Sequence, residues 1–306
     1  MLQKNLEQDI YAKEKKLLSP KMDVTFQVLF GEVGSEEITK EFLKAILKEK
    51  ITKVDLSKNP ILRRMRPNDK MGILDVIVEI DQKELCNIEM QLATREDIIQ
   101  RILYYWGRIY SRDIHKKEDY STLKRTIVIL IAGFEIKGLE ELEYLSKWQL
   151  IEVKGRKTIL TDYLEIDIIE LPKIYKRNSN KKDDLLDWLY FLEDPESKEV
   201  VKIMEQNEGV KKAKDKLEEI SQDEIMQRLA DWQENLRLDQ AYLKRMAIKE
   251  GKEEGRREGI IEGKREGKKQ GIEEGRKEGI IEGRKEGRKE GRKEGRKEGR
   301  KEGIKE

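Results

Sequence analysis

The stretch that most constrains the fold is residues 72–92, GILDVIVEIDQKELCNIEMQL, which predicts a β-hairpin. Two runs rich in β-branched and apolar residues flank a polar turn at residues 81–83. Residues two apart in a strand share a face. The predicted apolar face takes residues from both strands: Leu74, Val76, Val78, Ile80, Cys86, Ile88 and Met90. A chain with this pattern needs a sheet that buries one face of the hairpin.

The opposite face of the hairpin carries mostly polar side chains, with one isoleucine among them: Asp75, Ile77, Glu79, Asn87, Glu89 and Gln91. If the two apolar faces coincide, the numbers of paired residues sum to an even value, for example 166. That register sets Asp75 opposite Gln91 and Ile77 opposite Glu89, and it leaves Glu89 diagonal to Asp75 and within its reach. A turn with an even number of residues would separate these side chains, but burial of one face pins the register.

Two carboxylates and an amide then gather on one patch, and such a patch suits a hard divalent cation. Mg²⁺ prefers oxygen ligands and is usually held by one or two carboxylates together with phosphate and water. The bound ion would activate water and stabilise charge on a phosphoryl group. The other interpretation is a solvated face, because charged residues are ordinary on the exposed side of an antiparallel strand. Residue chemistry alone leaves both interpretations open.

The same residues resemble a known signature. Asp75, followed fourteen residues later by Glu89-Met90-Gln91, is similar to the D…(D/E)xK motif of the PD-(D/E)XK nuclease superfamily. It resembles most the recombination-promoting nuclease (Rpn), or putative transposase, family, in which glutamine takes the lysine position. The resemblance spans about residues 17 to 250 and rests on four segments: residues 18–31, 88–91, 101–105 and 169–173.

This resemblance implies a metal-dependent DNA endonuclease that hydrolyses phosphodiester bonds with Mg²⁺ or Mn²⁺. Asp75 and Glu89 would be the metal ligands, and Gln91 would position the attacking water. Glutamine carries no charge and is a poor proton acceptor, so a low rate is expected. Asp23 would be the fourth catalytic residue, an acid that such folds supply from a helix before the sheet. Its other interpretation is a carboxylate that stabilises its own helix N-terminus.

A basic face lies on the helix predicted for residues 95–114. Arg101, Arg108 and Arg112 are at i, i+7 and i+11, so they share one side of that helix. Beside the acidic patch they would hold the DNA backbone, together with Gln100, because contacts to phosphate position a protein without reading sequence. Gln100 and Arg101 are also our candidates for supporting the acidic residues. Seven residues of the helix predict a broad buried stripe: Ile98, Ile99, Ile102, Leu103, Trp106, Ile109 and Tyr110.

The remaining elements predict an α/β fold. Helices are expected at residues 20–30 and 36–49, and strands at 51–56, 125–133, 158–161 and 164–171, while 139–150 looks irregular or helical. Pro20 after Ser19 is typical of a helix start. The almost continuous apolar run at 125–133 suits a strand buried on both faces. This order predicts a mixed sheet flanked by helices, which agrees with the restriction-endonuclease-like fold that the resemblance implies.

The sequence divides into a nuclease-like domain (1–177), a helical region (178–250) and a repeat tail (251–306). In the tail, glycine recurs every four residues, mostly in the unit Gly-Arg-Lys-Glu. Like charges meet at i, i+4 in the pure repeats, and each glycine costs about 1 kcal/mol against alanine. We therefore expect a disordered or marginally helical tail, although a glycine row would let paired chains pack closely. The apolar residues of the helical region could dock on the domain or form a homo-oligomer.

Composition excludes several kinds of site. Cys86 is the only cysteine and His115 the only histidine, which rules out an internal disulfide, a multi-cysteine zinc site and a histidine-rich metal site. Residues 1–250 hold 45 Lys/Arg against 48 Asp/Glu, so DNA binding needs a local basic face rather than net charge. No apolar run approaches about 18 residues, and the N-terminal segment lacks a signal-peptide core. We expect a cytoplasmic protein without membrane contact.

Two functions of different classes follow from these features. The first is the metal-dependent DNA endonuclease. The second is a catalytically weak or inactive nuclease-fold protein that binds nucleic acid or mediates assembly, which the missing lysine, the helical region and the charged tail favour. A third, a transposase that also joins strands, is suggested by the resemblance alone, since the residues themselves indicate only a hydrolytic site.

Overall fold

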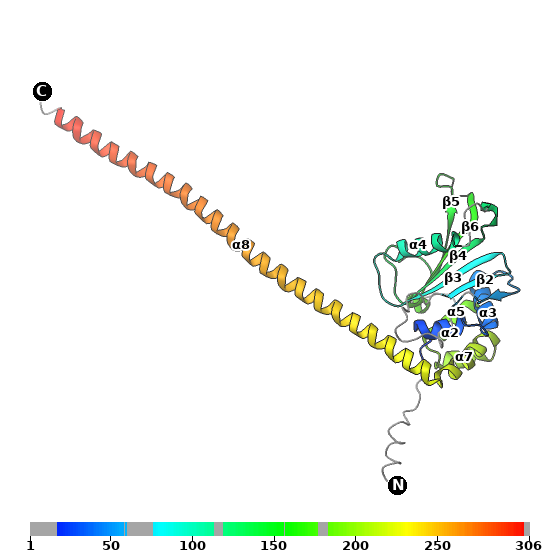
Figure 1. The fold of residues 1–306 in the computed structure, drawn as a ribbon. Coiled ribbons are helices and arrows are strands. Elements are labelled where there is room, and N and C mark those ends of the chain that lie inside the picture. Colours follow the sequence, from blue (N-terminus) through cyan, green and yellow to red (C-terminus); the bar gives the residue numbers. More distant parts are fainter. Residues whose placement is uncertain are drawn as a thin grey trace, which may run out of the picture. The chain divides into compact units, whose positions relative to one another are not determined.

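The computed structural model describes residues 17–57, 59, 76–112, 119–155, 157–176 and 183–302, with side chains as far as residue 297. These residues form two compact units that divide after Glu234. The first contains a sheet and its covering helices, and the second is part of one helix (Figure 1). Two residues singled out in the sequence, Asp75 and His115, lie outside the described ranges.

The described part of the first unit is built on a six-stranded sheet with the order β1-β2-β3-β4-β6-β5. Its strands are β1 (Val54–Asp55), β2 (Val76–Ile80), β3 (Glu84–Gln91), β4 (Arg125–Ala132), β5 (Leu145–Ile151) and β6 (Ile159–Glu170). The central strand, β4, pairs in parallel with β3 and β6, and the other pairs are antiparallel. Burial of β4 from Thr126 to Ala132 confirms the prediction made from its apolar sequence.

Helices cover both faces of this sheet (Figure 1). The helices of the described residues are α2 (Asp23–Phe30), α3 (Glu36–Leu47), α4 (Ile98–Tyr110), α5 (Asp184–Glu193), α6 (Lys198–Met204), α7 (Glu208–Ser221) and α8 (Glu224–Glu302), with short 3₁₀ turns η2 (Tyr120–Thr122) and η3 (Leu171–Lys176). The larger core joins α2, α3, α5 and α7 to one face and includes Phe42 and Trp188, whose rings lie 5.2 Å apart. On the other face, Ile102 of α4 packs with Val128. The predicted α/β fold with a mixed sheet is confirmed.

The predicted hairpin forms as β2 and β3, with its apolar side in the larger core. Val76 lies opposite Ile88 and Val78 opposite Cys86, and all four side chains are fully buried. Paired residue numbers sum to an even value, as predicted, but the sum is 164 rather than 166. As a correction, Ile77 therefore lies opposite Asn87 and not opposite Glu89.

This register follows from the place of the turn, which occupies residues 81–83 as predicted. Asp81 and Gln82 have left-handed φ angles of 48° and 60°, which β-branched residues avoid. The Asp81 carboxylate accepts hydrogen bonds from the backbone N–H groups of Thr52 (3.2 Å) and Lys53 (2.7 Å). A pairing sum of 166 would centre the turn on Lys83. These bonds hold the turn centred on Gln82, which corresponds to the observed sum of 164.

Helix α2 begins at Asp23, three residues later than predicted. Ser19 and Pro20 form a turn instead, in which the backbone N–H of Met22 donates to the carbonyl of Ser19 (3.2 Å). Met22 itself is extended, with φ −73° and ψ 135°, so the helix cannot include it. Asp23 still lies in the first helical turn, as expected, and Gly31 follows the last residue.

Helix α4 is shorter than the predicted 95–114 and less buried than its sequence indicates. Three residues of the predicted stripe are buried: Ile98, Ile102 and Ile109. Ile99 and Leu103 are 38% and 48% exposed. The reason is that α4 lies on an open sheet face, which covers only one side of the helix.

Strand β5 lies in a segment predicted to be irregular or helical, which is a correction. It is an edge strand that pairs only with β6, and Trp148, Leu150 and Ile151 are 42%, 44% and 47% exposed. A strand exposed on both sides lacks the alternation that marks a half-buried one. The two short strands predicted beside it are one strand, β6, whose last six residues are buried.

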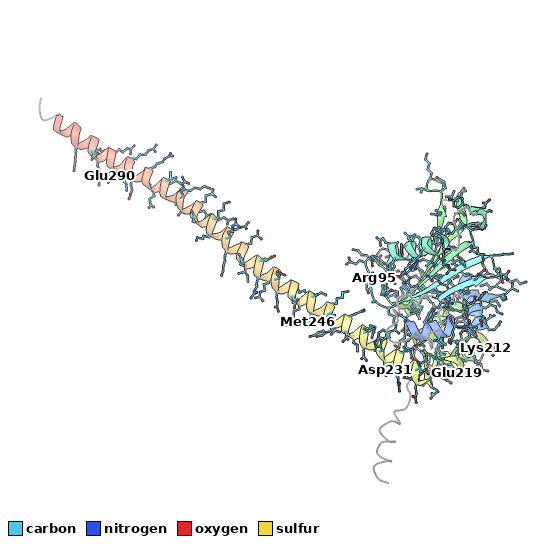
Figure 2. All side chains as sticks on the ribbon, in the orientation of Figure 1. Arg95, Lys212, Glu219, Asp231, Met246 and Glu290 are labelled. Atoms are coloured by element: carbon cyan, nitrogen blue, oxygen red, sulfur yellow. The ribbon has the colours of Figure 1, made fainter. Side chains whose placement is uncertain are left out.

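The second unit begins at Asn235 within α8 and is helical to Glu302. Side chains project from all sides of the helix between Met246 and Glu290 (Figure 2), and a Cβ added at each glycine from Gly251 to Gly295 would meet no atom within 4 Å. This differs from the expected disordered or marginally helical tail. Arg, Lys and Glu are strong helix formers. In the described residues, no helix has the length and apolar character needed to cross a membrane.

Candidate active site

Glu89 is the predicted site residue that the fold positions most firmly. It lies in β3 on the face that α4 covers, beside the central strand β4, and is only 2% exposed. Its Oε1 accepts a hydrogen bond from Nε of Arg101 at 3.1 Å. A carboxylate buried to this degree needs a positive partner or a proton. Arg101 supplies such a positive partner.

Arg101 is the positive group at the centre of this site. It belongs to α4, and its guanidinium lies over the ring of Tyr105, 4.9 Å from the ring centroid. Its charge also acts on two other carboxyls: it opposes the rise that burial causes in the pKa of Asp23, and it adds to the lowering of the Asp97 pKa, which comes mainly from Arg95. Three acids from three different parts of the chain are therefore within electrostatic reach of one arginine.

Asp23 reaches this neighbourhood from α2, in the layer on the opposite side of the sheet. Its Oδ2 accepts a hydrogen bond from Nε2 of Gln233 at 2.7 Å, and Oε1 of Gln233 accepts from the backbone N–H of Val24 at 3.3 Å. Burial raises the pKa of Asp23, and the bond from Gln233 and the charge of Arg101 oppose that rise. No local sequence pattern points to Gln233, because it lies 210 residues from Asp23.

Gln91 ends β3, two residues after Glu89 and so on the same side of the strand. Its side chain is partly exposed, and its Nε2 donates to the carbonyl of Ala93 at 3.2 Å. Asp75, the other predicted metal ligand, lies outside the described residues. It directly precedes Val76, which opens β2 opposite Ile88.

Asn87 is a residue of this face to which sequence reasoning assigned no role. It is fully buried two residues before Glu89, and neither its Oδ1 nor its Nδ2 has a hydrogen-bond partner in the described part of the chain. Buried amides normally find partners. The signal that could have revealed it is the same alternation that placed Glu89 and Gln91 on this face.

The predicted DNA-binding residues occupy different surroundings along α4. Gln100 and Arg108 are exposed, Arg112 is partly buried just after the helix, and only Arg101 pairs with Glu89. Among the described residues, no three acidic, histidine or cysteine side chains are placed to hold one metal ion. That set does not include Asp75.

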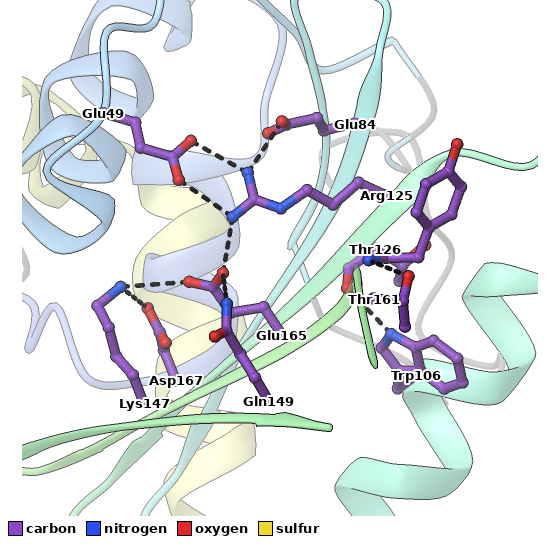
Figure 3. A network of polar contacts seen from close by, with 11 residues as sticks. Glu49, Glu84, Trp106, Arg125, Thr126, Lys147, Gln149, Thr161, Glu165 and Asp167 are labelled. Carbon is purple, nitrogen blue, oxygen red and sulfur yellow. Dashed lines mark hydrogen bonds and ion pairs between the residues drawn. The ribbon is translucent and has the colours of Figure 1, made fainter. Parts of the chain in front are cut away.

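A second polar network lies on the other face of the sheet (Figure 3). Arg125, at the start of β4, pairs with Glu49 (3.0 Å), Glu84 (2.9 Å) and Glu165 (2.7 Å). These bonds connect Glu49, two residues after the end of α3, with β3, β4 and β6. The sequence analysis missed this network because its members come from separate segments and share no motif.

Asp167 of β6 belongs to the same network and is fully buried. Lys147 of β5 donates to its Oδ2 at 2.7 Å, while its Oδ1 has no hydrogen-bond partner among the described residues. Burial raises the pKa of Asp167 to about 6, although Lys147 acts in the opposite direction. The network joins neighbouring strands and stands apart from the Glu89 site.

Comparison with known proteins identifies the family. A model of the family described as PD-(D/E)XK nuclease family transposase matches residues 20–247. Neither the curated proteins nor the solved structures gave a significant match. The family match includes α2, the hairpin and α4, which carry the candidate site, and it confirms the resemblance seen in the sequence. The chain therefore belongs to the PD-(D/E)XK nuclease family transposases.

Proposed function

We propose that the protein is a metal-dependent DNA endonuclease that hydrolyses phosphodiester bonds. The observation that carries the proposal is the buried Glu89 carboxylate, which meets a positive group on the α4 face. Family membership supports a nuclease-like activity. Glu89 occupies the acidic position of the D…(D/E)xK signature, and Gln91 follows at the lysine position.

Nucleases of this superfamily typically use divalent metal ions, and the residues present suit one. The candidate ligands are carboxylate oxygens, which Mg²⁺ and Mn²⁺ prefer. Asp75 and Glu89 would hold the ion, with Asp23 as an accessory acid. When bound, the ion would lower the pKa of water and stabilise the charge that develops on the phosphate.

The chain's own residues would orient the reactants. The Gln91 amide, which donates to Ala93, can orient a water molecule by hydrogen bonding, but it adds no charge to stabilise the transition state. Basic residues of α4, Arg108 and Arg112 with Gln100, would hold the DNA backbone beside the acidic residues. Because the usual lysine is absent, we expect slow cleavage.

The experiment is plasmid nicking with Mg²⁺ and with Mn²⁺, in which wild type is compared with Glu89→Ala and Gln91→Lys. We expect slow nicking by wild type, loss of nicking in Glu89→Ala, and faster nicking in Gln91→Lys. Nicking that survives in folded Glu89→Ala would place the chemistry elsewhere. If all three proteins fold and bind DNA but none nicks it, the endonuclease proposal is wrong.

The second candidate is a nuclease-fold protein that binds nucleic acid without cleaving it. The ion pair of Glu89 with Arg101 favours this candidate, because a neutralised carboxylate attracts a metal ion less strongly. It predicts DNA binding that does not change in Glu89→Ala. Filter binding of both proteins in the presence of a chelator distinguishes the two functions, together with the nicking assay.

A further inference from the structure

We propose that Arg101 is a counter-ion built into the active site, which neutralises Glu89 in the absence of metal and links metal uptake to DNA binding. The proposal rests on the endonuclease function above and adds a control of that same site. On arrival of DNA, the guanidinium exchanges the carboxylate for a phosphate group. The Glu89 oxygen that Arg101 releases then becomes available to the divalent ion.

The ion pair has the burial that such a counter-ion needs. The Glu89 side chain is 3% exposed, whereas that of Arg101 is 31% exposed. Glu89 is fixed in the middle of the sheet, between β2 and the central strand β4. Arg101 sits on a helix that covers only one side of the sheet and has solvent on the other. Of the two partners, Arg101 is therefore the one that can move.

Two other groups near Arg101 can interact with its guanidinium when it leaves Glu89. The Tyr105 ring lies one helical turn further on, 4.9 Å from the guanidinium carbon. Asp97 lies one turn earlier, and its carboxyl pKa is lowered mainly by Arg95 and also by Arg101. An arginine that leaves Glu89 stays near an aromatic face and a carboxylate, so the move does not leave its charge without a partner.

The chemistry of the guanidinium favours the exchange. Arginine binds phosphate oxygens through paired N–H groups and keeps its charge at any physiological pH. A divalent ion and a guanidinium on the same carboxylate repel each other, so each weakens the binding of the other. A DNA phosphate that attracts Arg101 removes this repulsion. Coupling is reciprocal, so DNA tightens metal binding and metal tightens DNA binding.

The test measures Mn²⁺ affinity directly, by calorimetry and by the electron paramagnetic resonance signal of free Mn²⁺. Wild type, Arg101→Gln, Arg101→Lys and Glu89→Gln are titrated with and without a short DNA duplex whose bridging oxygens are replaced to prevent cleavage. Arg228→Gln, on the exposed surface of α8, controls for the loss of one positive charge. Thermal melting checks that each variant folds.

Without DNA, we expect Arg101→Gln to bind Mn²⁺ about tenfold more tightly than wild type, which lies within the usual range of coupling between sites. DNA should tighten Mn²⁺ binding in wild type and much less in Arg101→Gln. Arg101→Lys keeps a charge and should resemble wild type in the absence of DNA. Arg228→Gln should match wild type under both conditions.

Two failures are distinguishable. If Glu89→Gln binds Mn²⁺ as tightly as wild type, no metal binds at Glu89 and the proposed function itself fails. If Glu89→Gln loses the site but Arg101→Gln equals wild type with and without DNA, the endonuclease proposal stands and the counter-ion role of Arg101 is wrong. Weaker Mn²⁺ binding in folded Arg101→Gln would also overturn the counter-ion role, because Arg101 would then only position Glu89.

Discussion

At the scale of single residues, two buried acids of the same sheet have different partners. Glu89 pairs with Nε of Arg101 at 3.1 Å. Asp167, on the other face, meets Lys147 through one oxygen and has a raised pKa of about 6, because burial outweighs that contact. The first acid is our proposed metal ligand, and the second makes the stability of the sheet depend on pH.

The Asp167 prediction concerns the free energy of unfolding. Because its pKa in the folded state is above the ordinary value of 3.8, the folded state binds the proton more tightly. The stability that this proton contributes is present below about pH 4 and is lost as pH rises through about 6. The change amounts to about 3 kcal/mol for two pKa units.

Urea denaturation from pH 4 to pH 7 checks this prediction. Asp167→Asn should remove the fall in stability that wild type shows over this range. Asp162→Asn, an exposed change on the same strand, should retain it. Parallel pH profiles for wild type and Asp167→Asn would show that Asp167 ionises with an ordinary pKa.

At the scale of elements, close packing leaves no room for a side chain at Gly209 of α7. A Cβ at Gly209 would lie 2.9 Å from the ring of Trp188 and 3.0 Å from Cβ of Glu41. Trp188 is 1% exposed, so its ring cannot move aside without disturbing α3 and α5. Gly107 of α4 is the opposite case, since a Cβ there would meet nothing within 4 Å.

Gly209→Ala should therefore destabilise the protein by roughly 1–3 kcal/mol, the usual cost of overpacking, despite the better helix propensity of alanine. Gly107→Ala should stabilise it by up to about 1 kcal/mol. Chemical denaturation of the two variants beside wild type measures both effects. Equal effects of the two substitutions would mean that the contacts around Gly209 do not limit its size.

The same scale shows what the sequence could predict. The hairpin and β4 were predictable because burial leaves alternation in one and a continuous apolar run in the other. Strand β5 was not, since an exposed edge strand has neither pattern, and the extent of α4 was overestimated because an apolar face does not reveal what covers it. In the candidate site, the alternation of residues predicted the face on which Glu89 lies. Its pairing with Arg101 could be recognised only from the packing of α4 on the sheet.

Contacts between distant segments explain the remaining gaps. Gln233 supports Asp23 from the far end of the described first unit, and Arg125 gathers acids from three separate segments. No local pattern encodes such pairs. Asn87 was visible in the alternation of β3, but its lack of a described partner became apparent only once its burial was known.

At the scale of the whole molecule, the chain joins a unit with a hydrophobic core to a helical tail whose described side chains are almost all exposed. Homo-oligomer formation through the C-terminal helix stays a prediction. Exposed apolar residues on the second unit, Leu238, Tyr242 and Leu243, supply a surface for it. A Cβ added at any glycine from Gly251 to Gly295 would meet nothing within 4 Å, so in a single chain these glycines only weaken the helix.

Replacing Gly267, Gly271 and Gly275 together by alanine should make the tail helix more persistent, because each change adds about 1 kcal/mol of helix propensity. Hydrogen–deuterium exchange of the amides in this segment should slow. Gln270→Ala, which removes no glycine, is the control and should have little effect. Unchanged or faster exchange in the triple variant would indicate that the glycines make contacts which alanine disrupts.

The four-residue spacing of these glycines has a geometric consequence. An α-helix turns by about 100° per residue, so each repeat advances its side chains by about 40° around the axis and about 6 Å along it. The rows of glycine, arginine, lysine and glutamate therefore wind around the helix like the threads of a screw. A rigid partner alongside the helix stays in contact with any one row for only a few repeats. If the partner slides by one repeat and rotates by about 40° around the axis, it makes the same contacts again. The pure Gly-Arg-Lys-Glu repeats at residues 283–302 thus offer several equivalent positions and no unique one.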